Sequence, residues 1–362
     1  MAKKHLLYIT NDSWWDTDVS VLPEVTDAFD LEVYCWSKKD PAERKFRDKT
    51  LPGNVTLHDL TFGRSKKDIR MILSSLLYGI KLVFASIGKT TVWVLDNNLW
   101  YGYLFMAFAS KRHTIISIHN YIDHGDARGW ERRMKDSVIE KFKFFHFQSA
   151  IQEKAFRKDY PGKVSFSTTM PVKDFGQPSE DAVAKDKRTY LFFGYIRDYK
   201  RPDLFIKAAN TLSNRANFIL AGTGEDLQKY KALIAPQSKM ECKLRLIDDK
   251  EIPDLFCSAD FLVLPYDDSS QSGPLLIAYN YGLPVIASDL PYFDSMIDDR
   301  YTGFLFTKGD LYSLVETIEE SIDMTQEEYS RMKDAMVRRA EEYKSPCSYC
   351  QSLMSFIADN QI

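Results

Sequence analysis

Cations and glycine-rich turns follow three apolar, strand-like runs in the second half of the chain. Arg197 and Lys200 follow the run 190–193 and its closing Gly194, Gly222 and Gly224 follow the run 218–220, and Ser270, Gln271, Ser272 and Gly273 follow the run that ends at Leu264. Guanidinium, ammonium and the free N–H groups of a helix start all bind phosphate oxygens. These residues predict a site for a phosphate-bearing ligand.

The elements that must position these residues alternate between strand and helix. After Lys200 the chain carries apolar residues at helical spacing, at Leu204, Phe205, Ala208, Ala209 and Leu212. In an open parallel sheet, ligands bind beyond the carboxyl ends of the strands. One such turn alone fits an ordinary strand-to-helix connection equally well. Three in sequence order favour a ligand site.

The first part of the chain repeats the alternation. Strand-like runs occur at 6–10, 31–36, 55–59, 91–95, 114–118 and 144–148. This pattern is typical of a parallel sheet with helices on both faces. The polar stretch 173–187 predicts a linker, so we expect domains at 1–172 and 188–345. Thr325 and Glu328 form a capping box that opens a long helix, and a last helix spans 346–362.

Composition restricts the class of protein. A length of 362 residues suits two domains, and 44% hydrophobic residues exclude a disordered chain. The net charge of −3 comes without a dense basic stripe, which argues against nucleic-acid binding. Five cysteines without a disulfide framework indicate a reducing compartment. With no signal peptide or transmembrane run, we expect a cytoplasmic protein that contacts the inner face of the plasma membrane.

The order of segments FFGYIRDYKRPDLFIKAA, LAGTGED, IPDLFCSADFLVLPY, SQSGPLLIAYNYGLPVIAS and TGFLFTKGDLYSLVETI resembles the donor-binding half of GT-B glycosyltransferases, in particular the retaining family 4 (glycosyl transferases group 1). The resemblance implies an α/β fold of two Rossmann-like domains whose parallel sheets face each other across a cleft. The last helix would cross back to the first domain.

The resemblance also implies the activity. Such an enzyme transfers a sugar from a UDP- or GDP-linked donor to a saccharide or lipid-linked saccharide, in bacterial surface polysaccharide synthesis. It would need neither a metal nor a cofactor, and it would retain the anomeric configuration.

The resemblance implies roles for residues of the second domain. Arg197 and Lys200 would neutralise the nucleotide diphosphate, although the family's usual arginine position holds Tyr195. The donor would also contact Gly194, Gly222, Gly224, Ser270, Gln271, Ser272 and Gly273, and the backbone near Ile247 would contact the base. Two family glutamates are replaced by Ser270 and Ala278. The ribose contact and the identity of the donor therefore stay open.

The first domain has a histidine directly after a strand-like run. In the family a histidine at this place contacts the donor sugar, which makes His119 the third catalytic candidate beside Arg197 and Lys200. A structural histidine in the domain core is the alternative. Asp123, His124 and Asp126 are candidate bases for an inverting enzyme.

Asn11, Asp12 and Ser13 take the place of the glycine-rich loop that many relatives have near the acceptor. We expect them on the acceptor side. Trp14 and Trp15 could stack on a sugar ring, or they could simply pack in the domain.

Three further patterns have a functional and a structural interpretation. The triplet 16–18 matches a D-x-D metal motif, and 347–350 is a lone C-x-x-C. We favour a structural role for both. The acid-poor segment 64–89 is either a surface helix on anionic lipid or, as we prefer, a buried helix with a basic exposed edge.

Two rival functions remain: a non-catalytic nucleotide- or glycan-binding relative, and a nucleotide-sugar epimerase.

Overall fold

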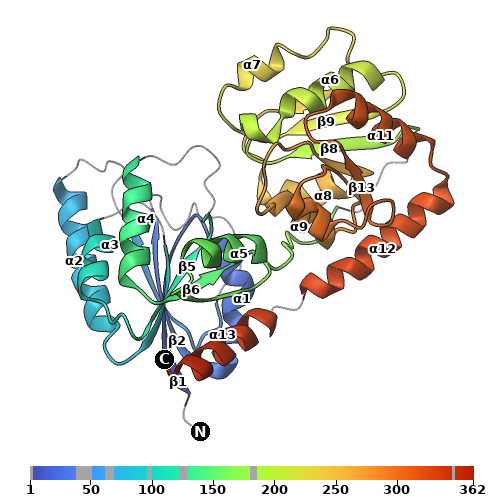
Figure 1. Ribbon diagram of the computed structural model, residues 1–362. Helices are drawn as coiled ribbons and strands as arrows, with labels where there is room; N and C mark the ends of the chain where they lie inside the picture. Colours follow the sequence, from blue (N-terminus) through green and yellow to red (C-terminus); the bar gives the residue numbers. More distant parts are fainter. Residues whose placement is uncertain are drawn as a thin grey trace. The chain divides into compact units, whose positions relative to one another are not determined.

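The computed structural model describes residues 3–37, 51–61, 69–95, 100–121, 129–179, 186–344 and 347–362. The chain divides into two compact units, and each is built around its own parallel sheet (Figure 1). The first unit comprises Met1–Pro171 and Ser345–Ile362, and the second comprises Val172–Lys344. The predicted α/β class with two parallel sheets is confirmed.

The first unit contains a seven-stranded sheet in the order β3-β2-β1-β4-β5-β6-β7, in which all neighbours are parallel. The strands are β1 Lys4–Asn11, β2 Phe29–Ser37, β3 Thr56–Thr61, β4 Thr90–Val94, β5 Thr114–Ile118, β6 Phe144–Phe147 and β7 Val164–Ser167. The first six coincide with the predicted runs. β7 was not predicted, because its alternation of Val and Phe with serine spans only four residues, the shortest length at which such a pattern indicates a strand.

Helices cover both faces of this sheet (Figure 1). They are α1 Trp15–Ala28, α2 Ile69–Ala85, α3 Trp100–Phe108, α4 Gly129–Lys141, α5 Ala150–Asp159 and α13 Cys347–Asn360. α13 packs against α1, and its Leu353 and Phe356 are buried in one apolar cluster with Leu6 and Val33 of the sheet. The last helix of the chain is therefore part of the core of the first unit.

The second unit contains a six-stranded parallel sheet in the order β10-β9-β8-β11-β12-β13. Its strands are β8 Thr189–Phe193, β9 Asn217–Ala221, β10 Glu241–Lys243, β11 Phe261–Leu264, β12 Val285–Ser288 and β13 Gly303–Phe306. Its helices are α6 Pro202–Leu212, α7 Leu227–Lys231, α8 Ile252–Cys257, α9 Gly273–Asn280, α10 Pro291–Met296, α11 Leu311–Asp323 and α12 Gln326–Lys344, with short 3-10 helices η2 Asp198–Lys200 and η3 Asp249–Glu251.

The long helix predicted from its capping box is α12. The Thr325 backbone N–H donates to Glu328 Oε2 at 2.9 Å, and the Glu328 N–H donates back to Thr325 Oγ1 at 3.2 Å. These reciprocal bonds satisfy two N–H groups that a helix start leaves free. No helix in the described ranges has both the length and the apolar character needed to cross a membrane.

The start of the predicted linker is packed on the second unit. The Lys173 N–H donates to Leu276 O at 3.4 Å, and the Phe175 N–H donates to Tyr281 Oη at 3.2 Å. The polar composition of this stretch reflects its position on the surface, while its backbone hydrogen bonds attach it to α9. Residues 180–185 of the predicted linker lie outside the described residues.

Candidate active site

The topology of the second unit brings two of the predicted segments to the same point of the sheet. Strand order reverses between β8 and β11, which are neighbours, and both strands end at the same edge. Ligands of doubly wound sheets bind at this reversal point, outside the carboxyl ends of the strands. The loop 194–200 follows β8 and the turn 265–272 follows β11. The candidate site is built on these two segments.

Lys200 ends η2 and places its ammonium beside the start of α9. A side-chain Cβ at Gly194 would lie 3.5 Å from Lys200 Nζ and 3.4 Å from Pro274 Cγ, so these groups share one small region. No carboxylate in the described part of the chain pairs with Lys200. Burial, and second the charge of Arg197, lower the pKa of Lys200 from 10.5 to about 8. An anion at this point would supply the missing counter-charge.

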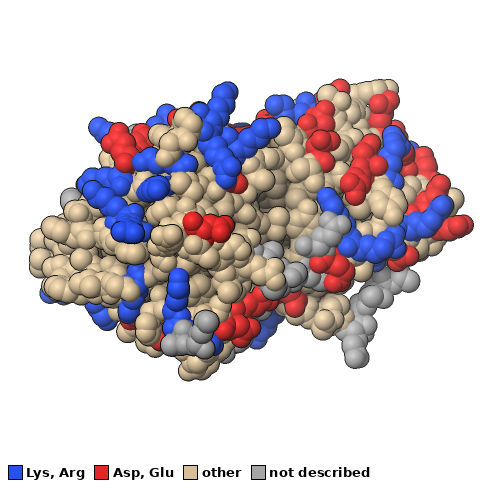
Figure 2. Space-filling view, turned by 60° about the horizontal axis from the view of Figure 1, so that its bottom comes forward, with Lys and Arg blue, Asp and Glu red and all other residues tan. Residues whose placement is uncertain are grey.

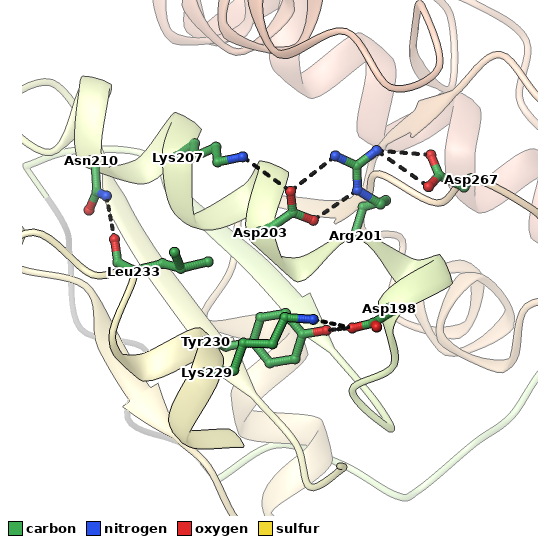
Figure 3. Close-up of polar contacts among 9 residues, drawn as sticks. All are labelled: Asp198, Arg201, Asp203, Lys207, Asn210, Lys229, Tyr230, Leu233 and Asp267. Atoms are coloured by element: carbon green, nitrogen blue, oxygen red, sulfur yellow. Dashed lines mark hydrogen bonds and ion pairs between the residues drawn. The ribbon is translucent and has the colours of Figure 1, made fainter. Parts of the chain in front are cut away.

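Arg197 stands at the entrance of the same loop with its side chain exposed. Its guanidinium lies 5.0 Å from the centroid of the Tyr195 ring, which is a cation–π contact. Tyr195 occupies the family's usual arginine position, so this residue contacts the arginine that we expect to replace it. The neighbouring Asp198 takes its hydrogen bonds from elsewhere. Figure 3 shows Lys229 and Tyr230 both reaching this carboxylate, with the lysine at 2.9 Å.

Arg201, the third basic residue of the loop, is held in ion pairs. It bonds Asp203 at 2.8 Å and Asp267 at 3.1 Å, and its backbone adopts a left-handed conformation with φ of 51° (Figure 3). The Asp267 N–H also donates to Tyr199 O at 2.7 Å. Because Asp267 follows β11, these bonds tie the loop after β8 to the loop after β11. Arg201 orders the site while its own charge is already balanced.

Gly222 and Gly224 allow the loop after β9 to approach the loop after β8. A Cβ at Gly222 would lie 1.8 Å from Gly194 O, and one at Gly224 would lie 2.2 Å from Ile196 O. The Ile196 N–H donates to Thr223 O at 2.8 Å across this contact. The sequence predicted direct donor contacts for both glycines. In this structure they make the close backbone approach that supports the lysine loop.

The turn 270–273 forms the start of α9. Ser272 is the N-cap, with its Oγ accepting from the Leu275 N–H at 3.4 Å, and Pro274 occupies a first-turn position. Ser270 and Ser272 are buried, whereas Gln271 is partly buried. A helix start of this kind carries a partial positive charge. It therefore adds to the two cations of the neighbouring loop.

Lys173 also lies at the start of α9, which the sequence did not predict. A Cβ at Gly273 would lie 3.8 Å from Lys173 Nζ. In the sequence this lysine belongs to a charged stretch without strand pattern, and nothing there distinguishes it from the other basic residues. The backbone bond from Lys173 to Leu276 of α9 holds this part of the chain here.

The remaining donor-side positions are buried. Ile247 lies between β10 and η3 and is 5% exposed, so any contact with a base would come from its backbone. Ala278, at the second missing glutamate, is fully buried in α9. A donor role for Ile247 stays a prediction.

His119 directly follows β5 in the first unit. Its ring is stacked on Trp14, with ring centroids 3.6 Å apart and an angle of 6° between the planes, and the residue is 3% exposed. Trp15 is packed in the apolar core. One face of Trp14 is thus covered by His119, and Trp15 has no face for a sugar. The contact of His119 with a donor sugar stays a prediction.

Asn11, Asp12 and Ser13 form the turn after β1. Asn11 is buried and its Oδ1 accepts from the Ser13 N–H at 2.9 Å, while Asp12 accepts from Ser37 Oγ at 2.7 Å. The side chain of Ser13 is exposed. Asn11 and Asp12 therefore shape the turn, and an acceptor role for the three residues is not tested by these contacts.

Asp18, the last residue of the D-x-D triplet 16–18, has the structural role that we favoured over metal binding. Its carboxylate is fully buried and accepts hydrogen bonds from Tyr8 Oη at 2.8 Å and from Thr10. Within the described residues, no three His, Cys, Asp or Glu side chains form a metal-binding group. Cys350 is buried in the core cluster with α13. The side chain of Cys347, and the candidate bases Asp123, His124 and Asp126, lie outside the described residues.

The second unit is similar to a known protein family. Residues 187–323 match the model of the family Glycosyl transferases group 1. The chain is 28% identical over 144 residues to the uncharacterized 41.2 kDa protein in the cps region of Klebsiella pneumoniae. It is 23% identical over 171 residues to the UDP-Gal:alpha-D-GlcNAc-diphosphoundecaprenol alpha-1,3-galactosyltransferase of Escherichia coli. These matches cover 39% and 45% of this chain, and 38% and 44% of those two proteins.

Comparison with solved structures covers both units. Sucrose-phosphate synthase from Thermosynechococcus elongatus matches with a TM-score of 0.73 at 12% identity, over 98% of this chain and 99% of that one. Alr3699/HepE of Anabaena, in complex with UDP and glucose, matches with a TM-score of 0.74 at 14% identity over the same shares. At these identities the likeness concerns the fold. The predicted GT-B fold and the resemblance to group 1 glycosyltransferases are confirmed.

Proposed function

We propose that this chain, whose second unit carries a group 1 glycosyltransferase domain, transfers a sugar from a nucleotide-diphosphate donor to a saccharide or lipid-linked saccharide acceptor. The names of two similar proteins support the substrate classes. One relative is named for a UDP-Gal donor and a diphosphoundecaprenol acceptor, and one structure contains UDP and glucose. The family match supports the enzyme class, and UDP-linked sugars are the first donors to test.

The single observation that carries the proposal is the position of Lys200. Its ammonium lies next to the start of α9, and the residue is partly buried and without a carboxylate partner among the described residues. In sugar transfer, the bond between the anomeric carbon and the diphosphate oxygen breaks, and negative charge develops on that oxygen. Fixed positive groups aimed at this charge stabilise the transition state. Lys200, Arg197 and the N-terminus of α9 supply such groups.

We propose that transfer needs no metal ion and no cofactor, and that it retains the anomeric configuration. Support for metal independence comes from the positive groups at the reversal point of the sheet, which can neutralise a diphosphate in place of a cation. Retention is carried by the family resemblance alone. Both statements can be tested on the purified protein.

We further propose a role in bacterial surface polysaccharide synthesis, at the cytoplasmic face of the inner membrane. The support comes from two similar proteins, one in a cps region and one named for a polyprenol-linked acceptor. The acceptor of this chain would then be presented at the membrane surface. Its sugar and linkage are left for experiment.

A non-catalytic nucleotide-binding relative is the second candidate. Ser270 and Ala278 stand where the family places two glutamates, and this specific difference favours it. The retained cations and the Ser272 cap favour nucleotide binding in either case. The two candidates differ in turnover only.

The test begins with a thermal-shift screen of UDP, GDP and their sugars, followed by donor hydrolysis and transfer to a lipid-linked saccharide. We expect a UDP- or GDP-linked sugar to stabilise the protein and to be consumed in the presence of EDTA. Stabilisation without any turnover would support the binding-only candidate. If no nucleotide stabilises the protein, both candidates fail. NMR of the product's anomeric proton then tests retention.

A further inference from the structure

The outer face of α2 carries a row of large apolar side chains exposed to solvent. The row, which we call the α2 ridge, consists of Ile69, Leu73, Leu77, Ile80, Phe84 and, just beyond the helix, Ile87. Each of these side chains is between 48% and 70% exposed. Single exposed apolar residues are normal, but a contiguous row of six marks an interaction surface.

The ridge points directly away from the core of the first unit. Its members recur every three or four residues, and each of the buried positions Met71, Tyr78 and Leu82 lies two residues before or after a ridge member. At about 100° per residue, this offset puts the two rows on opposite sides of the helix. The preferred interpretation from sequence, a buried helix with a basic exposed edge, is therefore wrong. One side is buried, and the other is mainly apolar.

The neighbouring helix extends the apolar surface. α3 packs on α2, where the close approach of Gly79 to Tyr101 joins them. Phe108 of α3 is 70% exposed, and Tyr103 is 45% exposed. Two adjacent helices of one unit thus expose large apolar side chains.

The described residues of α2, of α3 and of the stretches directly after them carry charge of one sign. The described stretches 69–95 and 100–121 contain no Asp or Glu, while Arg70, Lys81, Lys111 and Arg112 are exposed. Figure 2 shows this side of the first unit, at the left of the view, as a broad tan area bordered by Lys and Arg side chains. Apolar side chains with a cationic border match the acyl and phosphate layers of an anionic bilayer.

We propose that the α2 ridge, with Tyr103 and Phe108, docks the first unit on an anionic lipid bilayer. The helix would lie in the plane of the interface with the ridge inserted and the cations beside the lipid phosphates. It would not span the membrane, because its opposite side belongs to the core and no described helix is long and apolar enough to do so. The surface lies in a different unit from the donor site, and lipid binding needs no sugar nucleotide. Failure of one proposal therefore leaves the other standing.

The experiment is flotation of the full-length protein with phosphatidylglycerol-containing vesicles, without nucleotide. The ridge variant carries Leu73→Ser, Leu77→Ser and Phe84→Ser. Because these side chains are exposed, we expect unchanged circular dichroism and thermal stability, and a loss of vesicle affinity of at least about tenfold. The matched control replaces exposed apolar residues elsewhere, as Leu246→Ser, Tyr312→Ser and Met354→Ser. This control should bind like the wild type.

A charge variant tests the choice of lipid. Lys111→Glu with Arg112→Glu should lower affinity for anionic vesicles by about fivefold or more for each residue. The matched control is Lys154→Glu with Lys158→Glu, on exposed positions of α5. Equal binding of the wild type to pure phosphatidylcholine vesicles would overturn the anionic assignment.

Two outcomes would overturn the docking proposal as a whole. One is wild-type protein that does not float with anionic vesicles at low salt, or a ridge variant that floats equally well. The other is a wild-type dimer in analytical ultracentrifugation that the ridge variant converts to monomer, because the ridge would then be an interface between two copies of the chain.

Discussion

Lys200 Nζ lies 5.4 Å from the centroid of the Tyr266 ring, so the ammonium from the loop after β8 rests on an aromatic residue that follows β11. Tyr266 is buried, so its ring is a fixed neighbour of the ammonium. The contact crosses the point where the strand order reverses. It links the two segments on which the candidate site is built.

Nucleotide affinity should fall with rising pH above about 8. The pKa of Lys200 in the free protein is lowered to about 8 by burial and by Arg197, and a bound diphosphate would raise it again. Above that pH, binding must take up a proton, so affinity should fall towards about tenfold for each pH unit. The phosphates, with a pKa of about 6, no longer change charge there. Isothermal titration with UDP between pH 7.5 and 9.5 measures the slope, roughly flat at first and then falling.

Lys200→Arg is the control for this pH dependence. Its guanidinium stays protonated throughout the range, so the slope should disappear. The stability of the wild type should show the opposite trend. The lysine pKa is lower in the folded than in the unfolded protein, so its unfavourable contribution is full below pH 8 and is relieved as pH rises towards 10.5. If UDP affinity falls with pH as steeply in Lys200→Arg as in the wild type, a group other than Lys200 is titrating.

Gly222→Ala should destabilise the second unit and loosen the lysine loop. The backbone at Gly222 has φ of 143°, and the added methyl would lie 1.8 Å from Gly194 O. Backbone strain alone costs about 1–3 kcal/mol, and the clash adds to it. Urea denaturation measures the loss. Gly162→Ala, which meets no atom within 4 Å, should be neutral, and a neutral Gly222→Ala would contradict the role assigned to this glycine.

Asp18→Asn should lower stability without creating or removing any metal dependence. The buried carboxylate accepts two hydroxyl donors, from Tyr8 and Thr10, and the amide can replace only one oxygen. Hydrogen bonds to a charged group contribute about 1.5–3 kcal/mol. Denaturation and a Mg²⁺ and Mn²⁺ titration of transfer are the two measurements. A folded, stable variant that had lost a metal-dependent activity would restore the D-x-D interpretation. Asp30→Asn, on an exposed position of β2, is the control.

His119→Phe should lower transfer while preserving UDP affinity. Phenylalanine keeps the stack on Trp14 and the fold of the turn, but it removes the ring nitrogens. If His119 contacts the donor sugar, the rate should fall on the order of 100-fold, as for other lost polar contacts to a reacting group. Steady-state kinetics and UDP titration separate the two effects. An unchanged rate would assign His119 to the structure of the first unit alone.

Strand patterns and turn residues were enough to predict both sheets and the location of the candidate site. The apolar runs that end at Phe193 and Leu264 are each followed by turn residues, and their strands β8 and β11 are parallel neighbours, so their carboxyl ends meet. The ion-pair partners of the side chains could not be predicted from the sequence. Arg201 and Lys200 are adjacent basic residues, yet Asp203 and Asp267, from different segments, both pair with Arg201 and not with Lys200.

Exposure was the other property that the sequence could not supply. α2 has a helical pattern with apolar residues on nearly every side, which predicts burial, but only one side packs on the sheet. Lys173 shows the same limit, because its place at α9 depends on a backbone bond between distant residues.

The most direct test of the central claim is the UDP affinity of the double variant Arg197→Met with Lys200→Met. Both substitutions remove charge while keeping a long side chain, and Lys200→Met also removes a partly buried charge, so the fold should be preserved. The matched control is Lys231→Met with Lys239→Met, on exposed positions of α7 and of the segment after it. We predict that titration calorimetry gives an affinity lowered by about 100-fold or more in the double variant and unchanged in the control. Undiminished affinity in the double variant would contradict the assignment of this site.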